Sequence, residues 1–230
     1  MLSELKEVVW SANIHLAKSG LAIITWGNVS GFDRGKSLVV IKPSGVNYDE
    51  MKPDDMVVVN IDGEKVEGKL NPSSDTPTHL ELYRSLPGIG GIVHTHSPYA
   101  CGWAQSGRDI PAMGTTHADH FYGDIPCTRK LTHAEVESDY ELNTAKVIME
   151  RFREIDPSAI PGVLVNDHGP FAWGQDPDEA VTNAIALEEV AKIALVSMTI
   201  AGNDPIDDYL LDKHYNRKHG RRAYYGQKRK

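Results

Sequence analysis

The segment Ile92-Val93-His94-Thr95-His96 joins a run of apolar, β-branched residues to two histidines that are two positions apart. A short apolar run of this kind predicts a strand buried within the fold. Side chains alternate along a strand, so His94 and His96 are expected to project from the same face. Two imidazoles placed in this way can bind one metal ion, although a lone His-x-His pair is more often a surface or hydrogen-bonded pair.

Strands and helices are predicted on both sides of this segment. Runs rich in β-branched residues predict strands at residues 38–41, 56–61 and 162–165. Apolar spacing and end signals predict helices from a cap at Ser3 to a stop at Gly20, from Thr76 to Leu86 and from Asp176 to about Ala201. The helices do not alternate regularly with the strands, which favours an α/β domain with a mixed, mainly antiparallel sheet covered by helices. No linker rich in Pro, Gly or Ser divides the chain, so we expect one domain over residues 1–230.

Several classes of protein are excluded by local composition. Residues 1–7 contain two glutamates and no continuous apolar core, unlike a secretory signal. The longest apolar segment, residues 185–202, is interrupted by charged residues and does not fit a membrane span. Cys101 and Cys127 match no metal or redox spacing, as expected for two reduced, part-buried thiols. We therefore expect a cytoplasmic protein that does not contact membranes.

Charge is unevenly distributed along the chain. The net charge is −8, yet residues 213–230 hold eight of the 24 Lys and Arg residues and no acid, so residues 1–212 carry −16. An acidic body argues against general nucleic-acid binding. An anionic ligand would therefore have to be held by local hydrogen-bond donors.

A third histidine strengthens the metal hypothesis. His168 follows an apolar strand and precedes Gly169-Pro170, a position from which a side chain can reach a shared cleft. Three histidines with one open position are typical of a catalytic zinc site. Asp75, just before the helix that begins near Pro77, could add an oxygen ligand or could simply cap that helix.

Three small polar turns could bind an anion. Ser73 and Ser74 lie at the start of a helix, where hydroxyls and backbone N–H groups face the positive end of the helix dipole. Lys42-Pro43-Ser44-Gly45 supplies a charge and a glycine that permits close approach of a ligand, and Gly27-Asn28-Val29-Ser30 is a third such turn. Each turn alone is more often an ordinary turn or cap. Their occurrence together with the histidines favours an anionic substrate.

Two further regions offer acid–base groups. Asp119 closes the polar segment Gly114–Asp119, where it could carry a proton or stabilise a turn. The C-terminal region from Lys213 to Gln227 interleaves basic and aromatic residues. That pattern fits a nucleic-acid contact, a solvated tail or a flap over an anionic active site.

Taken together, these motifs resemble the class II aldolase family over nearly the whole chain. The segments that carry the resemblance are residues 25–30, 41–45, 72–79, 93–97, 115–119, 125–129, 168–174, 211–215 and 223–227. The resemblance implies a three-layer α/β/α domain that usually forms a homotetramer, with active sites between subunits. It also implies an enzyme that acts on a small sugar phosphate.

The resemblance further implies a role for individual residues. Zn²⁺, with Mn²⁺ or another divalent ion as alternatives, would be bound by Asp75, His94, His96 and His168. The residues that match substrate and phosphate contacts are Gly27, Asn28, Lys42, Ser44, Gly45, Ser73 and Ser74. Asp119 and Tyr225 match an acid–base pair, with Tyr225 contributed by the neighbouring subunit. Residues 213–230 would form a basic active-site tail, in which His214 and Arg217 match accessory residues near the bound phosphate or sugar.

In the two segments nearest the C-terminus, residues 211–215 and 223–227, the chain resembles the pentose-phosphate 4-epimerases of the family more than its aldolases. This resemblance implies a reaction that converts L-ribulose 5-phosphate to D-xylulose 5-phosphate by zinc-assisted cleavage and re-formation of the C3–C4 bond. Lys228-Arg229-Lys230 extends past the family's usual ending and could alter closure of the tail.

Other functions remain open at this point. The nearest is an aldolase of the same family, of the L-fuculose 1-phosphate type, and another is a non-catalytic binding module like the adducin head. A zinc hydrolase is disfavoured because no His-Glu-x-x-His motif is present. A Schiff-base lyase that uses Lys42 would leave the histidines without a role.

Overall fold

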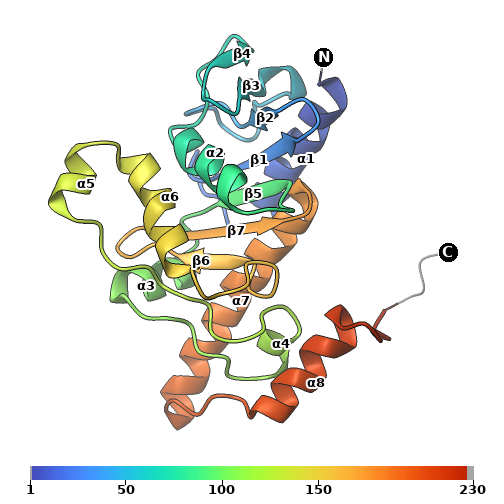
Figure 1. Ribbon diagram of the computed structural model, residues 1–230, viewed down its shortest axis with the longest axis vertical. Helices are drawn as coiled ribbons and strands as arrows, with labels where there is room; N and C mark the ends of the chain where they lie inside the picture. Colours follow the sequence, from blue (N-terminus) through green and yellow to red (C-terminus); the bar gives the residue numbers. More distant parts are fainter. Residues whose placement is uncertain (1, 227–230) are drawn as a thin grey trace.

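The computed structural model describes residues 2–226 (Figure 1). Gln227 and the Lys228-Arg229-Lys230 extension lie outside the described residues, so the expectation for that extension stays a prediction. Among the described residues, no helix is both long enough and apolar enough to cross a membrane.

One seven-stranded sheet forms the centre of the fold, in the order β4-β3-β2-β1-β5-β7-β6. The strands are β1 (Asn28–Asp33), β2 (Leu38–Ile41), β3 (Val57–Asn60), β4 (Lys65–Glu67), β5 (Gly91–His94), β6 (Gly162–Leu164) and β7 (Pro170–Gly174). Neighbouring strands all run antiparallel. The mainly antiparallel sheet is therefore confirmed, and in the described part of the chain the parallel component is reduced to one isolated bridge, between Cys127 and Leu164.

Helices cover both faces of this sheet and give the expected three layers (Figure 1). The helices are α1 (Ser3–Lys18), the short 3-10 helix η1 (Pro53–Asp55), α2 (Thr76–Ser85), α3 (Pro98–Ser106), α4 (Thr115–Ala118), α5 (His133–Glu137), α6 (Tyr140–Arg151), α7 (Pro177–Ala201) and α8 (Asp208–His219). Helices α1 and α7 pack on one face, and α2 and α6 pack on the other. Helix α8 packs on α4 at the end of the molecule remote from β4.

Burial on both faces explains why the strands are continuous apolar runs. Val40 and Val93 pack with residues of α1 and α7, whereas their chain neighbours Val39 and Ile92 pack with α2 and α6. Period-2 alternation therefore sends successive side chains into two different cores. Each such side chain contributes about 1.5–3 kcal/mol when fully buried.

Two predicted boundaries are shifted. The residue at the cap position of α1 is Leu2, and Ser3 is the first helical residue, so the expected cap by Ser3 is wrong. Strand β5 ends at His94 and not at His96, because α3 begins only four residues later, with Pro98 in its first turn. The residue before a proline is biased to an extended conformation, and Ser97 adopts one. His96 is therefore placed by a connecting loop.

Candidate metal centre and anion pocket

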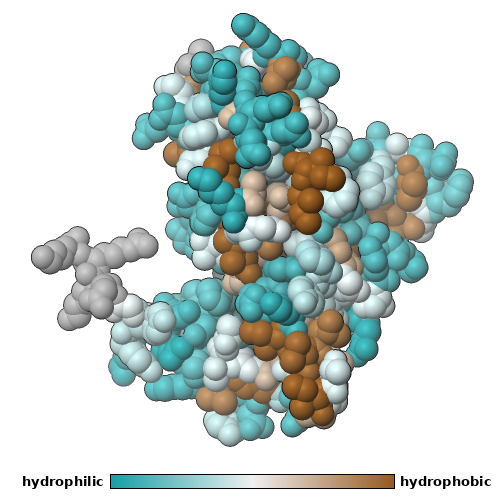
Figure 2. Space-filling model, turned by 180° about the vertical axis from the view of Figure 1, so that it is seen from behind, coloured by the Kyte–Doolittle hydropathy of each residue, from teal (hydrophilic) through white to brown (hydrophobic). Residues whose placement is uncertain are grey.

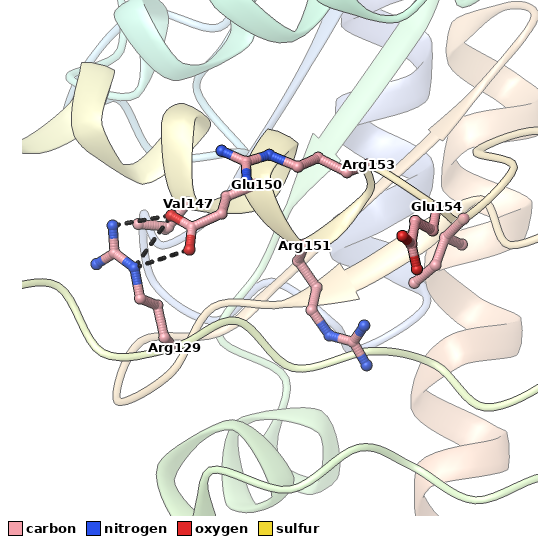
Figure 3. Close-up of a pocket in the computed structure, with 7 residues that line it drawn as sticks. Arg129, Val147, Glu150, Arg151, Arg153 and Glu154 are labelled. Atoms are coloured by element: carbon pink, nitrogen blue, oxygen red, sulfur yellow. Dashed lines mark hydrogen bonds and ion pairs between the residues drawn. The ribbon is translucent and has the colours of Figure 1, made fainter.

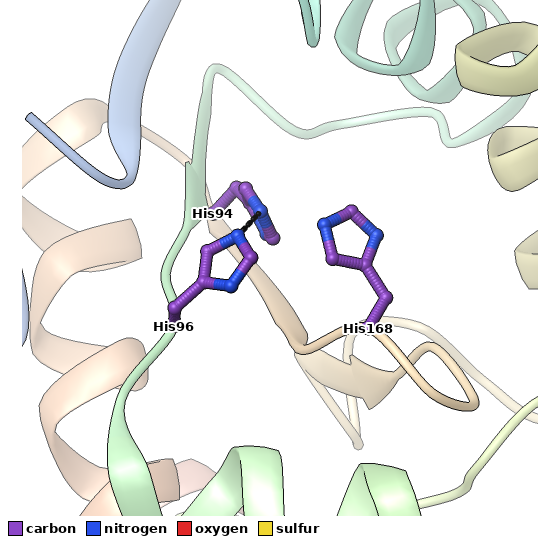
Figure 4. A group of neighbouring side chains, drawn as sticks. All are labelled: His94, His96 and His168. Atoms are coloured by element: carbon purple, nitrogen blue, oxygen red, sulfur yellow. Dashed lines mark hydrogen bonds between the residues drawn. The ribbon is translucent and has the colours of Figure 1, made fainter.

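His94, His96 and His168 converge on one space, as their facing rings show in Figure 4. One ring nitrogen from each lies within 4.8 Å of the others. The Nε2 atoms of His94 and His96 are 3.1 Å apart. Two nitrogen ligands on a tetrahedral zinc ion are about 3.3 Å apart when each Zn–N bond is about 2.0–2.1 Å. The spacing of His94 and His96 therefore fits two ligands of one small divalent ion, and His168 is placed to be a third.

The imidazole of His94 is held in one orientation. Its Nδ1 donates to the carbonyl oxygen of Pro170 at 3.0 Å, so Nε2 keeps the lone pair that a metal ion needs. The ring stacks on Phe171 with centroids 4.3 Å apart, and the residue is buried. Because Pro170 and Phe171 lie on β7, the pairing of β5 with β7 positions this ligand.

A tight turn between β6 and β7 positions His168. The Val165 amide donates to the Gly169 carbonyl at 2.9 Å, and Asp167 adopts a positive φ of 60°. A Cβ at Gly169 would lie 2.7 Å from the Thr95 carbonyl oxygen, so only glycine lets this turn approach the loop that carries His96. The Tyr140 hydroxyl, at the start of α6, lies 3.3 Å from His168 Nδ1.

His96 and His168 are kept neutral, as metal ligands must be. Burial, together with the proximity of the His94 and His96 rings, lowers the pKa of His168 to about 3. Partial desolvation and the neighbouring His94 ring also lower the pKa of His96. A metal ion therefore displaces few protons from these two rings.

Asp75 lies beside the histidines. Its Oδ2 accepts a 2.7 Å hydrogen bond from Asn28 Nδ2, and the side chain makes no capping hydrogen bond to α2. Burial opposes ionisation of Asp75, but the charges of His94 and His79 and the Asn28 amide outweigh it, so the pKa lies below its usual value. Within the described residues, the ligand atoms that lie within 4.8 Å of one another belong to the three histidines, so a ligand role for Asp75 stays a prediction.

The three polar turns are assembled next to this centre. Asn28 Nδ2 donates to Ser73 Oγ at 3.1 Å, and the Ser73 amide donates to the Lys42 carbonyl at 3.0 Å. Ser44, Gly45 and Ser74 are exposed. Gly45 has a φ of +67° and open space where a Cβ would lie, which leaves room for a ligand against the backbone.

Gly27 allows the first turn to approach the metal centre. It has a φ of +80°, and a Cβ there would lie 2.7 Å from the His94 carbonyl oxygen. The close approach follows from the pairing of β1 with β5, in which Asn28 lies opposite His94. The structure thus gives Gly27 a structural role in addition to its predicted contact with substrate.

Lys42 faces the protein. Its buried ammonium donates to the carbonyl oxygens of Val46 at 2.9 Å and Pro43 at 3.3 Å, and lies 4.8 Å from the centre of the Tyr48 ring. Burial lowers the pKa of Lys42 to about 8. The lysine therefore organises the turn at residues 43–46, and its direct contact with an anion stays a prediction.

Asp119 and Tyr225 are brought together by α8. Asp119 accepts hydrogen bonds from Arg217 at 3.0 and 2.6 Å and from His214 at 3.1 Å. The Tyr225 ring lies under Arg217 and Lys218, 4.9 and 4.6 Å from their charged groups. Burial opposes ionisation of Asp119, but the hydrogen bonds from Arg217 and His214 and the charge of Lys218 outweigh it and lower its pKa.

This second cluster does not lie at the histidines of its own chain. Among residues 2–226, no hydrogen bond or ring contact joins Asp119 or Tyr225 to the three histidines. Figure 1 places α4 and α8 at the end of the molecule below the sheet. A single chain therefore holds two separate halves of the predicted site.

A surface hollow away from the histidines is a different feature. It encloses about 500 Å³ beside the end of α6 (Figure 3). Arg129 pairs with Glu150 at 3.0 Å, and Arg151 pairs with Asp109 at 2.8 Å. Carboxylates thus neutralise these two arginines, and none of the described histidines lines the hollow.

Two groups that hold the histidines carry no recognisable signal in the sequence. Tyr140 is separated from His168 by 28 residues, and Phe171 reads only as part of an apolar strand. Both contacts depend on how α6 and β7 pack. Such contacts between distant segments cannot be read from local spacing.

A model of the class II aldolase and adducin N-terminal domain family matches residues 7–195. The chain belongs to this family. Among curated relatives of this class II aldolase-family protein are the L-ribulose-5-phosphate 4-epimerases UlaF of Salmonella paratyphi A and Salmonella typhi. Each is 58% identical over 228 residues, which is 99% of this chain and 100% of the relative.

Solved structures confirm the class II aldolase fold. An L-fuculose 1-phosphate aldolase superposes with a TM-score of 0.79 at 28% identity, over 94% of this chain and 97% of that one. The L-fuculose-1-phosphate aldolase of Thermus thermophilus superposes with a TM-score of 0.66 at 25% identity, over 88% and 98% of the two chains. The family assignment thus holds over nearly the full length of the protein.

Proposed function

We propose that this protein is a metal-dependent enzyme that converts L-ribulose 5-phosphate to D-xylulose 5-phosphate. The observation that carries the proposal is the convergence of three imidazoles beside polar, exposed turns. The full-length identity of 58% to 4-epimerases favours this reaction over others in the family.

The proposed ion is Zn²⁺, with Mn²⁺ or another divalent ion as alternatives. His94, His96 and His168 would bind it, and Asp75 would add an oxygen ligand. When bound, the ion would act as a Lewis acid that stabilises negative charge on the substrate oxygens.

Cleavage of a carbon–carbon bond explains how C4 can be inverted. C4 is not adjacent to the C2 carbonyl, so direct removal of its hydrogen is difficult. Removal of the C4 hydroxyl proton allows the C3–C4 bond to break into an enediolate and glycolaldehyde phosphate. The aldehyde turns its other face to the enediolate before the bond re-forms.

Two proton carriers are needed, one for each face of the aldehyde. We assign these roles to Asp119 and Tyr225, which α8 holds together. His214 and Arg217 would orient Asp119, with which both form hydrogen bonds. Arg217 and Lys218 hold their charged groups against the Tyr225 ring and so fix its position beside Asp119.

The polar turns would hold the phosphate group of the aldehyde while it rotates. The proposed contacts are Gly27, Asn28, Ser44, Gly45, Ser73 and Ser74, with Lys42 supporting the second turn. An aldehyde held in this way re-forms the bond before it can leave, which distinguishes an epimerase from an aldolase.

We also propose a homotetramer in which a neighbouring subunit supplies the Asp119–Tyr225 cluster. The separation of this cluster from the histidines within one chain supports the idea. Exposed apolar side chains on the second half of α7 offer an interface, and Figure 2 shows an apolar area over this end of the molecule. These side chains are Ile193, Leu195, Val196 and Ile200.

We propose a cytoplasmic setting, with a small-molecule sugar phosphate as partner and no contact with nucleic acid or membranes. The net charge of −8 supports the exclusion of nucleic acid.

Product analysis tests the proposed reaction. Zinc-loaded protein mixed with L-ribulose 5-phosphate should form D-xylulose 5-phosphate. Accumulation of two-carbon and three-carbon fragments would instead indicate an aldolase, the activity named for the structurally similar fuculose enzyme. No turnover by zinc-loaded protein would favour a non-catalytic module of the adducin type.

A further inference from the structure

Glu188 is a buried carboxylate on α7 that binds the first turn of α3. Its Oε1 accepts a 2.9 Å hydrogen bond from the Tyr99 amide, and its Oε2 accepts a 2.8 Å bond from the Ala100 amide. The residue is 8% exposed. Among the described residues, it forms no ion pair with a Lys, Arg or His, so its charge faces these backbone donors.

Helix α3 has no cap of its own. Ser97 occupies the cap position without a capping hydrogen bond, and its hydroxyl instead accepts from Thr95 at 3.2 Å. Pro98, the first helical residue, has no N–H. The amides of Tyr99 and Ala100 are therefore the first donors that need an acceptor, and Glu188 satisfies both.

The first turn of α3, which Glu188 caps, directly follows the loop that carries His96. Only Thr95, His96 and Ser97 connect the end of β5 to α3. Within the described residues, the side-chain hydrogen bond of His96 is to His94. His94 and His168, by contrast, are each hydrogen-bonded outside the metal centre.

Besides its ring contacts with Trp26, His94 and His168, the orientation of His96 depends on its backbone. Strand β5 fixes one end of the loop, and the start of α3 fixes the other. Without the Glu188 cap, the end of the loop that joins α3 would be free to move. The exposed His96 imidazole could then move away from His94 and His168.

We infer that Glu188 is a positioning residue that fixes the N-terminus of α3 and thereby holds the His96 imidazole in the metal centre. This inference rests on the proposed function, because it assumes that the three histidines bind an ion. The Glu188 carboxylate would act on His96 through the backbone of residues 97–99, which joins the capped Tyr99 amide to the histidine. Outer groups of this kind typically change metal affinity by about tenfold to a hundredfold.

The test compares Glu188→Gln with Glu189→Gln, a matched change at the next residue, which is exposed. Zinc affinity is measured by competition with a chromogenic chelator, and circular dichroism checks folding. Glu188→Gln keeps the size of the side chain but replaces one acceptor with a donor that faces an amide N–H. We expect Glu188→Gln to weaken zinc binding about tenfold or more, and Glu189→Gln to leave it unchanged.

Two further measurements distinguish positioning from a general loss of stability. Hydrogen exchange should accelerate at the Tyr99 and Ala100 amides of Glu188→Gln. In a His96→Ala background, Glu188→Gln should weaken zinc binding less than about twofold, because the group through which it acts is gone. Equal losses in both backgrounds would overturn the inference, as would wild-type affinity in folded Glu188→Gln.

These readouts do not depend on turnover. Wild-type protein that binds zinc but does not convert L-ribulose 5-phosphate would contradict the proposed reaction and leave the affinity test intact. Wild-type protein that binds no zinc would overturn both.

Discussion

Asn28 and His94 lie opposite each other across the β1–β5 pair. His94 faces the two other histidines, while the Asn28 amide donates to Asp75 and Ser73. The register of the β1–β5 pair thus places the side chain that binds Ser73 and Asp75, before α2, next to the metal ligand His94. A change of that register by one residue would turn these side chains to opposite faces of the sheet.

Replacement of Asn28 by Ala should therefore weaken substrate binding. The change removes a donor to the Asp75 carboxylate, and hydrogen bonds to charged groups contribute about 1.5–3 kcal/mol. We expect KM for L-ribulose 5-phosphate to rise about tenfold or more. Asn47→Ala, a change at an exposed position, is the control and should leave KM unchanged. Equal KM values for both variants would remove Asn28 from the pocket.

Gly169→Ala should weaken zinc binding. The new Cβ would meet the Thr95 carbonyl oxygen at 2.7 Å, so the turn that carries His168 must move away from the loop that carries His96. We expect zinc affinity, measured by chelator competition, to fall about tenfold. Gly102→Ala has open space around its new methyl group and should bind zinc like the wild type. Tight binding by Gly169→Ala would show that the close approach of the two loops is not needed.

The elements of the fold were predictable because both faces of the sheet are buried. That burial produces continuous apolar runs at Val57–Asn60 and Gly91–His94, which are recognised without knowledge of their partners. The convergence of His94 and His96 was also expected, but for a different reason, namely that both would lie on one strand and project from the same face. The strand ends at His94, and the loop before Pro98 does the positioning.

Contacts between distant segments could not be predicted from the residues themselves. Arg217 and Asp119 are 98 residues apart, and Glu188 and Tyr99 are 89 apart. Neither pair has a local spacing that marks it. The hydrogen bonds of the buried Lys42 ammonium to the turn carbonyls were not predicted either, while its contact with an anion stays a prediction. Such outcomes depend on packing that a single sequence does not display.

Tyr225→Phe should reduce epimerisation severely. The variant keeps the ring under Arg217 and Lys218 but has no proton to transfer. General acid–base catalysis contributes about 10²–10⁴-fold, so we expect kcat to fall by about that factor. Tyr224→Phe, whose ring lies over Lys213, is the control and should retain its rate. An unchanged kcat in Tyr225→Phe would exclude the phenol from the mechanism.

The contact between α8 and α4 should weaken in acid. The pKa of Asp119 is lowered in the folded protein, so its contribution to stability is complete above the unfolded pKa of about 3.9. That contribution is lost as pH falls through the lower, folded value. Hydrogen exchange in Asp208–His219 should therefore accelerate below about pH 4.

Asp119→Asn should show the same acceleration already at neutral pH, because the amide cannot carry the charge that Arg217 and Lys218 meet. Asp204→Asn, at an exposed position, serves as the control and should follow the wild type. If hydrogen exchange in α8 changed neither with pH nor in Asp119→Asn, the Asp119 charge would not be what holds α8 against α4.

The central claim is that three imidazoles bind a single divalent ion. X-ray absorption of the zinc-loaded protein measures it most directly, because the spectrum reports the ligands of the ion itself. We predict one zinc ion per chain with three imidazole nitrogens at about 2.0–2.1 Å, and a loss of that signal in His94→Ala. Sulfur ligands at about 2.3 Å, or zinc retained unchanged by His94→Ala, would contradict the claim.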